Sequence, residues 1–331
     1  MRIVGGCTHQ NVEGQKEIPM PNTGWRRRLA MFVFCLMVAF DVPSARAQGA
    51  NDQKAGHGAE FWRKIAKNRY AIPPGEQVFG LTLELSGYLG LTDPELRDDL
   101  AYSILATWIV EQKMLSSEEL VRLLQDWEAN LQNGIGEVGT DSVFKRSFSS
   151  LCLATLAERD LKDPFLGRDR FRRLLDAGLT YMNAERDLRG FDATKGWIHA
   201  TAHTADLLAA LAKNPFFTKE EQGRVLEAIG HRLENADQVF TYGEQDRLAR
   251  VAATIVTRKD FDGQRWHSWI AKMNREDRTV WNESPPKMQQ LARFENDSYF
   301  LSATVARIAL EPASPASQDA RKTVLAVLRL R

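Results

Sequence analysis

The chain has 331 residues, of which 44% are hydrophobic and 26% are charged. This composition is typical of a globular protein and excludes a disordered or collagen-like chain. Its 44 lysines and arginines against 43 aspartates and glutamates leave almost no net charge. Binding to nucleic acid requires a basic surface that neutralises phosphates, so this balance excludes nucleic acid as the main partner.

The N-terminal segment has the pattern of an export signal. Three arginines at 26–28 precede an apolar run at 29–40, and small residues follow. As a helix, this run would span about 18 Å, which is too short for a bilayer core of about 30 Å. We therefore predict a cleaved signal peptide over 1–47, starting at Met1 or Met20. The mature protein would then be periplasmic or secreted, with no stable membrane anchor.

A polar tail at 48–58 precedes a long region in which apolar residues recur at helical spacing. Ser116 and Thr218 are each followed by two glutamates, the pattern of a capping box that begins a helix. Further periodic stretches lie at 96–114, 142–157, 168–183, 197–212, 244–257, 286–308 and 316–330. The breaks between them are short and contain Gly, Pro or Asn, so neighbouring helices are expected to be antiparallel. The sequence predicts one all-α domain at 59–331, with helical hairpins stacked as an α-solenoid or α/α array.

Side chains capable of chemistry gather in the segment that begins the predicted helix 197–212. At 100° per residue, Lys195, His199, His203 and Asp206 would share one narrow stripe. Two histidines one turn apart can hold a divalent metal, with Asp206 as a third ligand. Without a metal, Asp206 can orient an imidazole that acts as a general base. The third alternative is a polar helix face, in which the two histidines hydrogen-bond to neighbouring loops and Asp206 pairs with an arginine.

The turn before this helix adds charged candidates for ligand contact. Glu185 and Asp187 can supply carboxylates, and Arg189 can clamp an anionic group of a substrate. Lys195 and Trp197 complete the predicted ligand-binding set. The alternative is that these charges are solvated or paired with one another, as is common in turns between helices.

Other stretches fit the framework better than a site. Arg146 lies among small polar residues and can satisfy a buried carboxylate. Glu244 and Arg247 lie in the first turn of a helix, where acids interact well with the helix dipole, although both can also face a cleft. Trp266 and Trp269 can form an aromatic rim, but tryptophans at helical spacing usually belong to a core.

These segments carry a resemblance to a bacterial family, the domain of unknown function numbered 2785. The similar motifs are RSFS at 146–149, ERDLRG at 185–190, KGWIHATAHTAD at 195–206 and EQDRLA at 244–249. The resemblance extends over about 144–257, with Thr204 at a position where the family has a smaller residue. It implies an all-helical fold and supplies no activity.

Three functions follow from these candidates. The first is an exported binding or scaffold protein that recognises a ligand or partner protein through a polar pocket of His199, His203 and Asp206. The second is a hydrolase or lyase, metal-dependent or of acid–base type, that uses the same cluster. The third is a purely structural polar network.

Overall fold

A computed structural model describes residues 56–273, 277–282 and 284–330. The predicted signal peptide and most of the polar tail lie outside the described residues. Within the described ranges, no helix is both long and apolar enough to cross a membrane.

The described chain is all-α apart from one short hairpin, as predicted. The α-helices are α1 (Ala59–Lys67), α2 (Val78–Tyr88), α3 (Ser103–Ala106), α4 (Ser117–Asn130), α5 (Ser142–Lys162), α6 (Gly167–Ala184), α7 (Ala200–Ala212), α8 (Lys219–Glu234), α9 (Glu244–Val256), α10 (Gly263–Met273), α11 (Met288–Leu310) and α12 (Pro315–Leu328). Two π-helical segments, η1 (Glu95–Tyr102) and η2 (Thr107–Glu111), flank α3, and η3 (Asp277–Asn282) is a 3-10 helix. The hairpin consists of β1 (Phe191–Asp192) and β2 (Gly196–Trp197), which pair antiparallel.

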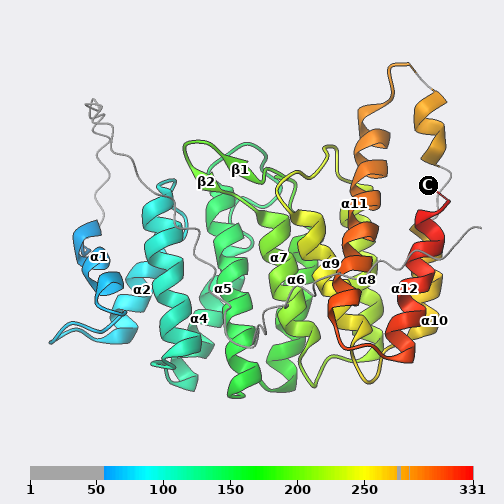
Figure 1. The fold of residues 1–331 in the computed structure, drawn as a ribbon. Coiled ribbons are helices and arrows are strands. Elements are labelled where there is room, and N and C mark those ends of the chain that lie inside the picture. The colour runs from blue at the N-terminus through cyan, green and yellow to red at the C-terminus, as the bar shows by residue number, and fades with distance from the viewer. Residues whose placement is uncertain (1–55, 274–276, 283, 331) are drawn as a thin grey trace, which may run out of the picture. The chain divides into compact units, whose positions relative to one another are not determined.

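The helices pack in two series. Helices α5, α7, α9 and α11 contact one another in that order, and α6, α8, α10 and α12 do the same (Figure 1). The two series are joined through contacts of α6 with α7, α8 with α9, and α11 with α12. Each helix can therefore bury an apolar stripe against several neighbours, which is how an array of helices builds one continuous core.

Both predicted capping boxes are present. The Ser116 backbone N–H donates to Glu119 at 2.7 Å, and the Glu119 N–H donates back to the Ser116 hydroxyl at 3.3 Å. Thr218 and Glu221 form the equivalent box at the start of α8. These reciprocal bonds satisfy backbone donors that a helix N-terminus leaves free, so they fix where α4 and α8 begin.

The predicted helix 197–212 begins three residues later than expected, at Ala200. Gly196 and His199 have positive φ angles of 74° and 48°, which are incompatible with a right-handed helix. Asp192 also accepts the backbone N–H groups of Thr194 and Lys195, which closes a tight turn. Residues 191–197 therefore fold as a hairpin, and Lys195 does not belong to the helical stripe. The predicted helix 96–114 is likewise not a uniform α-helix, because it contains η1 and η2.

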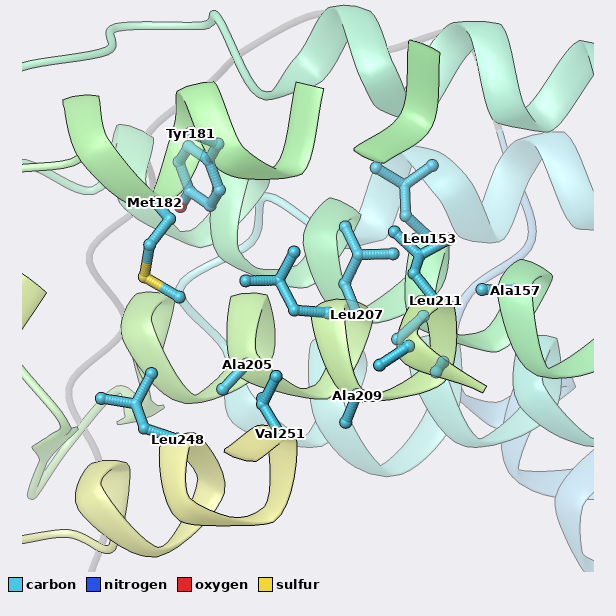
Figure 2. Close-up of a cluster of buried hydrophobic side chains, with 14 of the residues drawn as sticks. Leu153, Ala157, Tyr181, Met182, Ala205, Leu207, Ala209, Leu211, Leu248 and Val251 are labelled. Atoms are coloured by element: carbon cyan, nitrogen blue, oxygen red, sulfur yellow. The ribbon is translucent and has the colours of Figure 1, made fainter. Parts of the chain in front are cut away.

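Helix α7 is the centre of the core. Every residue from Ala200 to Ala212 is buried, and small side chains let the neighbouring helices approach closely. Figure 2 shows Leu207 and Leu211 among side chains that include Leu153, with Leu248 on another side of α7. A helix buried on all sides must also bury its polar residues, and α7 carries the histidines and aspartate of the candidate site.

A buried ion pair joins three segments beside this core. The Arg146 guanidinium donates to both oxygens of Glu185, at 2.6 and 3.2 Å, and to the Asn133 carbonyl at 2.8 Å. The Arg232 side chain donates to the Glu185 carbonyl at 2.9 Å. Arg146 thus satisfies a buried carboxylate, as the sequence predicts, and it ties the end of α6 to α5 and the α4–α5 loop.

This pairing predicts that Glu185→Gln lowers the free energy of unfolding by about 3 kcal/mol, because it leaves the buried Arg146 charge without a counter-ion. The measurement is urea denaturation followed by circular dichroism. Asp176→Asn is the matched control, because the Asp176–Arg224 pair is exposed and such pairs contribute about 0–1 kcal/mol. Equal losses in the two variants would contradict the role given to the buried pair.

Candidate ligand-binding site

The β1–β2 hairpin is held against the helices by a fully buried arginine. The Arg97 guanidinium donates to the Lys195 carbonyl at 2.7 Å, to the Trp197 carbonyl at 3.3 Å and to the Leu91 carbonyl at 2.8 Å. It also lies over the rings of Phe144 and Phe148, at 4.2 and 4.7 Å from their centroids. Backbone and aromatic contacts from three segments therefore meet at one cation, which fixes the hairpin in place. No motif in the sequence singled out Arg97.

Asp98 lies next to this arginine, with 2.7 Å between its Oδ1 and the Arg97 Nε. Burial raises the pKa of Asp98 to about 6, against the opposing effect of the Arg97 charge. The anchor of the hairpin therefore has a carboxyl that is easier to protonate than an ordinary surface aspartate.

Gly190 brings a second loop close to the hairpin. Its carbonyl accepts the N–H groups of Ile198 and His199, at 2.9 and 3.2 Å. A Cβ atom added at Gly190 would lie 2.4 Å from the Tyr242 ring and 2.5 Å from the Glu244 carboxylate. The approach of the two loops thus requires a residue without a side chain.

His199 lies at the N-terminus of α7 in a left-handed conformation and is nearly buried. Its Nε2 donates to the Tyr242 carbonyl at 3.0 Å, so its Nδ1 carries the lone pair of a neutral imidazole. Its ring stacks on Trp197, with centroids 4.4 Å apart and planes inclined by 24°. Burial lowers the pKa of His199 to about 4, which keeps the ring neutral at physiological pH.

His203 lies one turn further along α7 and is enclosed by α5. Ser147 donates its hydroxyl hydrogen to the Ile198 carbonyl, so it accepts from His203 Nδ1 at 2.8 Å. The His203 ring meets Phe148 edge-on at 5.0 Å and His199 at 5.7 Å. Burial lowers the pKa of His203 well below its ordinary value, and the neighbouring His199 adds to this effect. The two imidazoles are adjacent, as predicted.

Asp206 does not interact with the histidines as predicted. Its two carboxylate oxygens accept hydrogen bonds from Arg247 and Arg250 of α9. With both oxygens engaged by cations, the carboxylate neither orients an imidazole nor presents a free metal ligand. Among the residues that the structure describes, no group of three or more His, Cys, Asp or Glu side chains is placed to hold a metal ion. In the part of the chain that the structure describes, His199, His203 and Asp206 are therefore not brought together as one group of ligands.

The charges of the preceding turn are also engaged within the protein. Glu185 binds Arg146, and Asp187 accepts from Arg189 at 2.6 Å and from the Gly139 N–H at 3.0 Å. Lys195 donates to Asp141 at 2.6 Å. Glu185, Asp187, Arg189 and Lys195 therefore hold loops together, which is the alternative that the sequence left open.

Trp197 is the predicted ligand-binding residue that lies on the surface. Phe191, Trp197 and Tyr242 are 41%, 42% and 46% exposed. Their ring centroids lie 4.9 Å apart for Phe191 and Trp197, 6.0 Å for Phe191 and Tyr242, and 6.3 Å for Trp197 and Tyr242. We call these three residues the aromatic patch. Phe191 and Tyr242 carry no sequence signal for a site, because the contact joins loops that are distant in the chain.

A small cavity of about 160 Å³ lies beside the aromatic patch, between segments 188–191 and 238–244. The lining includes Phe191, Tyr242 and Glu244. Glu244 is buried, and its Oε1 lies 3.8 Å from the His199 Nε2. Burial raises the pKa of Glu244 above its ordinary value. Glu244 therefore contributes more to the site than the helix capping that the sequence suggested.

The second aromatic group singled out from the sequence is part of the core. Trp266 and Trp269 are buried, and the Trp266 indole N–H donates to the Ala320 carbonyl at 3.2 Å. Neither side chain is available as a rim for a ligand.

Residues 131–305 match the sequence profile of a family described as "Protein of unknown function (DUF2785)". The match extends on both sides of the motifs at 146–249 and covers helices α5 to α10 with most of α11. No curated protein and no solved structure matches the chain.

The buried imidazoles predict that the protein loses stability in mild acid. The pKa of His199 is about 4 in the folded protein and 6.5 in an unfolded chain, so the unfolded chain binds more protons between these values. The neutral His199 ring therefore contributes roughly 3 kcal/mol to the free energy of unfolding above pH 6.5, and this contribution is lost as the pH falls towards 4.

The measurement compares urea denaturation of the wild type and His199→Asn from pH 8 to pH 4. Asparagine tolerates the left-handed backbone and does not titrate, so this variant should lose stability less steeply below pH 6.5. The difference at pH 8 reports the loss of packing alone. Parallel pH profiles would contradict a buried neutral imidazole at this position.

Proposed function

The chain belongs to the DUF2785 family, whose model matches more than half of its length, and we propose that it is a binding protein that holds ring-shaped ligands on the aromatic patch. The family description names no activity, so the proposal is argued from the site. The patch consists of Phe191, Trp197 and Tyr242, with His199 behind it. This is the binding function expected from the sequence, with the centre of recognition moved from the histidine stripe to the hairpin in front of it.

The exposure of the three aromatic rings is the observation that carries the proposal. Large apolar side chains gathered at a surface are unfavourable in water, and such groups mark interaction sites. Here the Trp197 indole stacks on His199, and Phe191 meets it edge-on. One indole face is therefore backed by a buried ring, and the exposed part of Trp197 is the surface on which a planar ligand group can stack.

The backing of the patch supports binding without large rearrangement. Arg97 fixes the hairpin backbone, and the His199 Nε2 donor fixes the loop that carries Tyr242. A surface that is ordered before a ligand arrives loses little conformational entropy on binding. Sugar rings and aromatic groups are the ligands that such a surface suits.

The place of action belongs to the same proposal. The predicted signal peptide would deliver the protein to the periplasm or outside the cell, where soluble saccharides and peptides are available as ligands.

The test is a binding screen of the full chain against neutral disaccharides, acidic disaccharides, indole and N-acetyl-tyrosine amide, followed by calorimetry. Trp197→Ala should weaken any binding found by at least about tenfold, because the stacking surface is removed. Trp281→Ala is the matched control, since Trp281 is also exposed, at 58%, and lies on η3 outside the patch.

Two results decide the proposal. Loss of binding in Trp197→Ala with wild-type affinity in Trp281→Ala supports it. Failure of every compound to bind the wild type, or equal effects of the two substitutions, would overturn it.

Acid–base catalysis at the same place is the second candidate, and one observation favours it. Glu244, which lines the small cavity, lies 3.8 Å from His199, and burial raises the pKa of Glu244 while it lowers that of His199. Opposite shifts of neighbouring groups are typical of acid–base pairs. Prolonged incubation of a bound disaccharide, with Glu244→Gln as the control, tests this candidate by the appearance of product.

A further inference from the structure

Two arginines of α9 carry more hydrogen-bond donors than the protein uses. Arg247 donates to Asp206 through Nη1, and Arg250 donates through Nη2. Each guanidinium has five N–H donors, and the Nε of Arg250 is buried without a partner. Among the described residues, Asp206 is the only carboxylate within ion-pair distance of either guanidinium.

Both arginines are accessible to a ligand. Their side chains are 41% and 37% exposed, whereas Asp206 between them is buried. They lie three residues apart on α9, so they share one face of that helix. The Asp206 carboxylate balances the charge of one of the two guanidiniums, so Arg247, Arg250 and Asp206 together keep one positive charge. Of the two acids in the first turn of α9, Asp246 is bound to Arg307, and Glu244 is buried beside His199, where burial raises its pKa and the Arg247 charge opposes that effect.

The two arginines lie further along the same pair of helices, α7 and α9, that begin next to the aromatic patch. Tyr242 lies two residues before α9 and is bound to His199 at the start of α7, while Arg250 is bound to Asp206 further along α7. The two helices therefore run in the same direction here. Asp206 is seven positions after His199, and Arg250 is seven positions after Gly243, which is about 10 Å along either helix.

The histidines fill the space between the two ends. His203 lies one turn after His199, and Arg247 is close enough to both rings for its charge to add to the effect of burial on their pKa values. The aromatic patch and the pair of guanidiniums thus lie at the two ends of one stretch of α7, whose two imidazoles are buried between them. The helical rise of about 10 Å between these ends is of the order of the length of two linked sugar rings.

We propose that the ligand is an acidic oligosaccharide, in which one sugar ring stacks on Trp197 and the carboxylate of the next ring binds Arg247 and Arg250. This inference rests on the proposed binding function. A guanidinium presents parallel N–H donors that match a planar carboxylate, and two of them on one helix face can bind both of its oxygens. Asp206 holds the two side chains in position without neutralising both of them.

The experiment is isothermal titration calorimetry of the full chain with digalacturonate and with galactobiose, which has hydroxymethyl groups in place of the carboxylates. The wild type should bind digalacturonate at least about tenfold more tightly than galactobiose. Raising the salt concentration should weaken binding of digalacturonate and leave binding of galactobiose unchanged.

Three variants assign the effect to residues. Arg250→Gln and Arg247→Gln should each reduce the affinity for digalacturonate towards that for galactobiose, and neither should change galactobiose binding. Arg224→Gln is the matched control, because Arg224 is a similarly exposed arginine paired with Asp176 on other helices. It should bind both saccharides as the wild type does.

The outcomes separate this inference from the proposed function. Equal affinity of the wild type for the two saccharides, or a preference for digalacturonate that is insensitive to salt or survives both α9 substitutions, overturns the acidic ligand and leaves the aromatic site standing. Binding of indole or N-acetyl-tyrosine amide but of neither saccharide also overturns it. If no compound of either experiment binds the wild type, both proposals fall together.

Discussion

The exposed β1–β2 hairpin is held in place by the guanidinium of Arg97, which is itself completely buried. Arg97 donates to carbonyls of the hairpin about 100 residues away in the chain and lies over two phenylalanine rings of α5. A buried charge is favourable only when it is well hydrogen-bonded, so the carbonyls and rings around Arg97 must keep their places. The order imposed on the hairpin backbone extends to Trp197, whose carbonyl is one of these acceptors. A buried arginine thus fixes the position of the exposed Trp197 ring.

The buried histidines extend the same principle into the site. His199 donates to the carbonyl of Tyr242, and His203 donates to Ser147, so each ring is held by a specific neighbour. Because burial disfavours the charged form, both rings are neutral, and they do not compete for anions with the arginines next to them. The site therefore separates an uncharged aromatic end from a charged end on the same pair of helices.

The parts of this arrangement that sequence reasoning could predict are those that depend on local spacing. Helical periodicity and capping patterns place α4 to α9 closely, and the four-residue spacing of His199 and His203 brings their rings together. The resemblance to the family identified the segments that meet at the site. The start of α7 was misplaced, because a left-handed His199 and a hairpin at 191–197 leave no periodic signal that distinguishes them from a helix.

What could not be predicted depends on contacts between distant segments. The sequence allows Asp206 to pair with an arginine, but nothing near it indicates that Arg247 and Arg250 are the partners. The aromatic patch likewise joins Phe191 and Trp197 to Tyr242, which follows them by more than 40 residues. Such pairings are set by how α7 and α9 pack, and that packing is determined by the whole core.

The contact at Gly190 has a consequence for how the site can diversify. The atoms that a Cβ at Gly190 would meet belong to the side chains of Tyr242 and Glu244, so the main chain at 190 packs directly against the Tyr242 ring of the aromatic patch. A side chain at 190 would displace the Tyr242 ring, whereas the rings at 191 and 197 are not part of this contact. Selectivity can therefore change through positions 191 and 197, while the glycine at 190 and the ring at 242 have to change together.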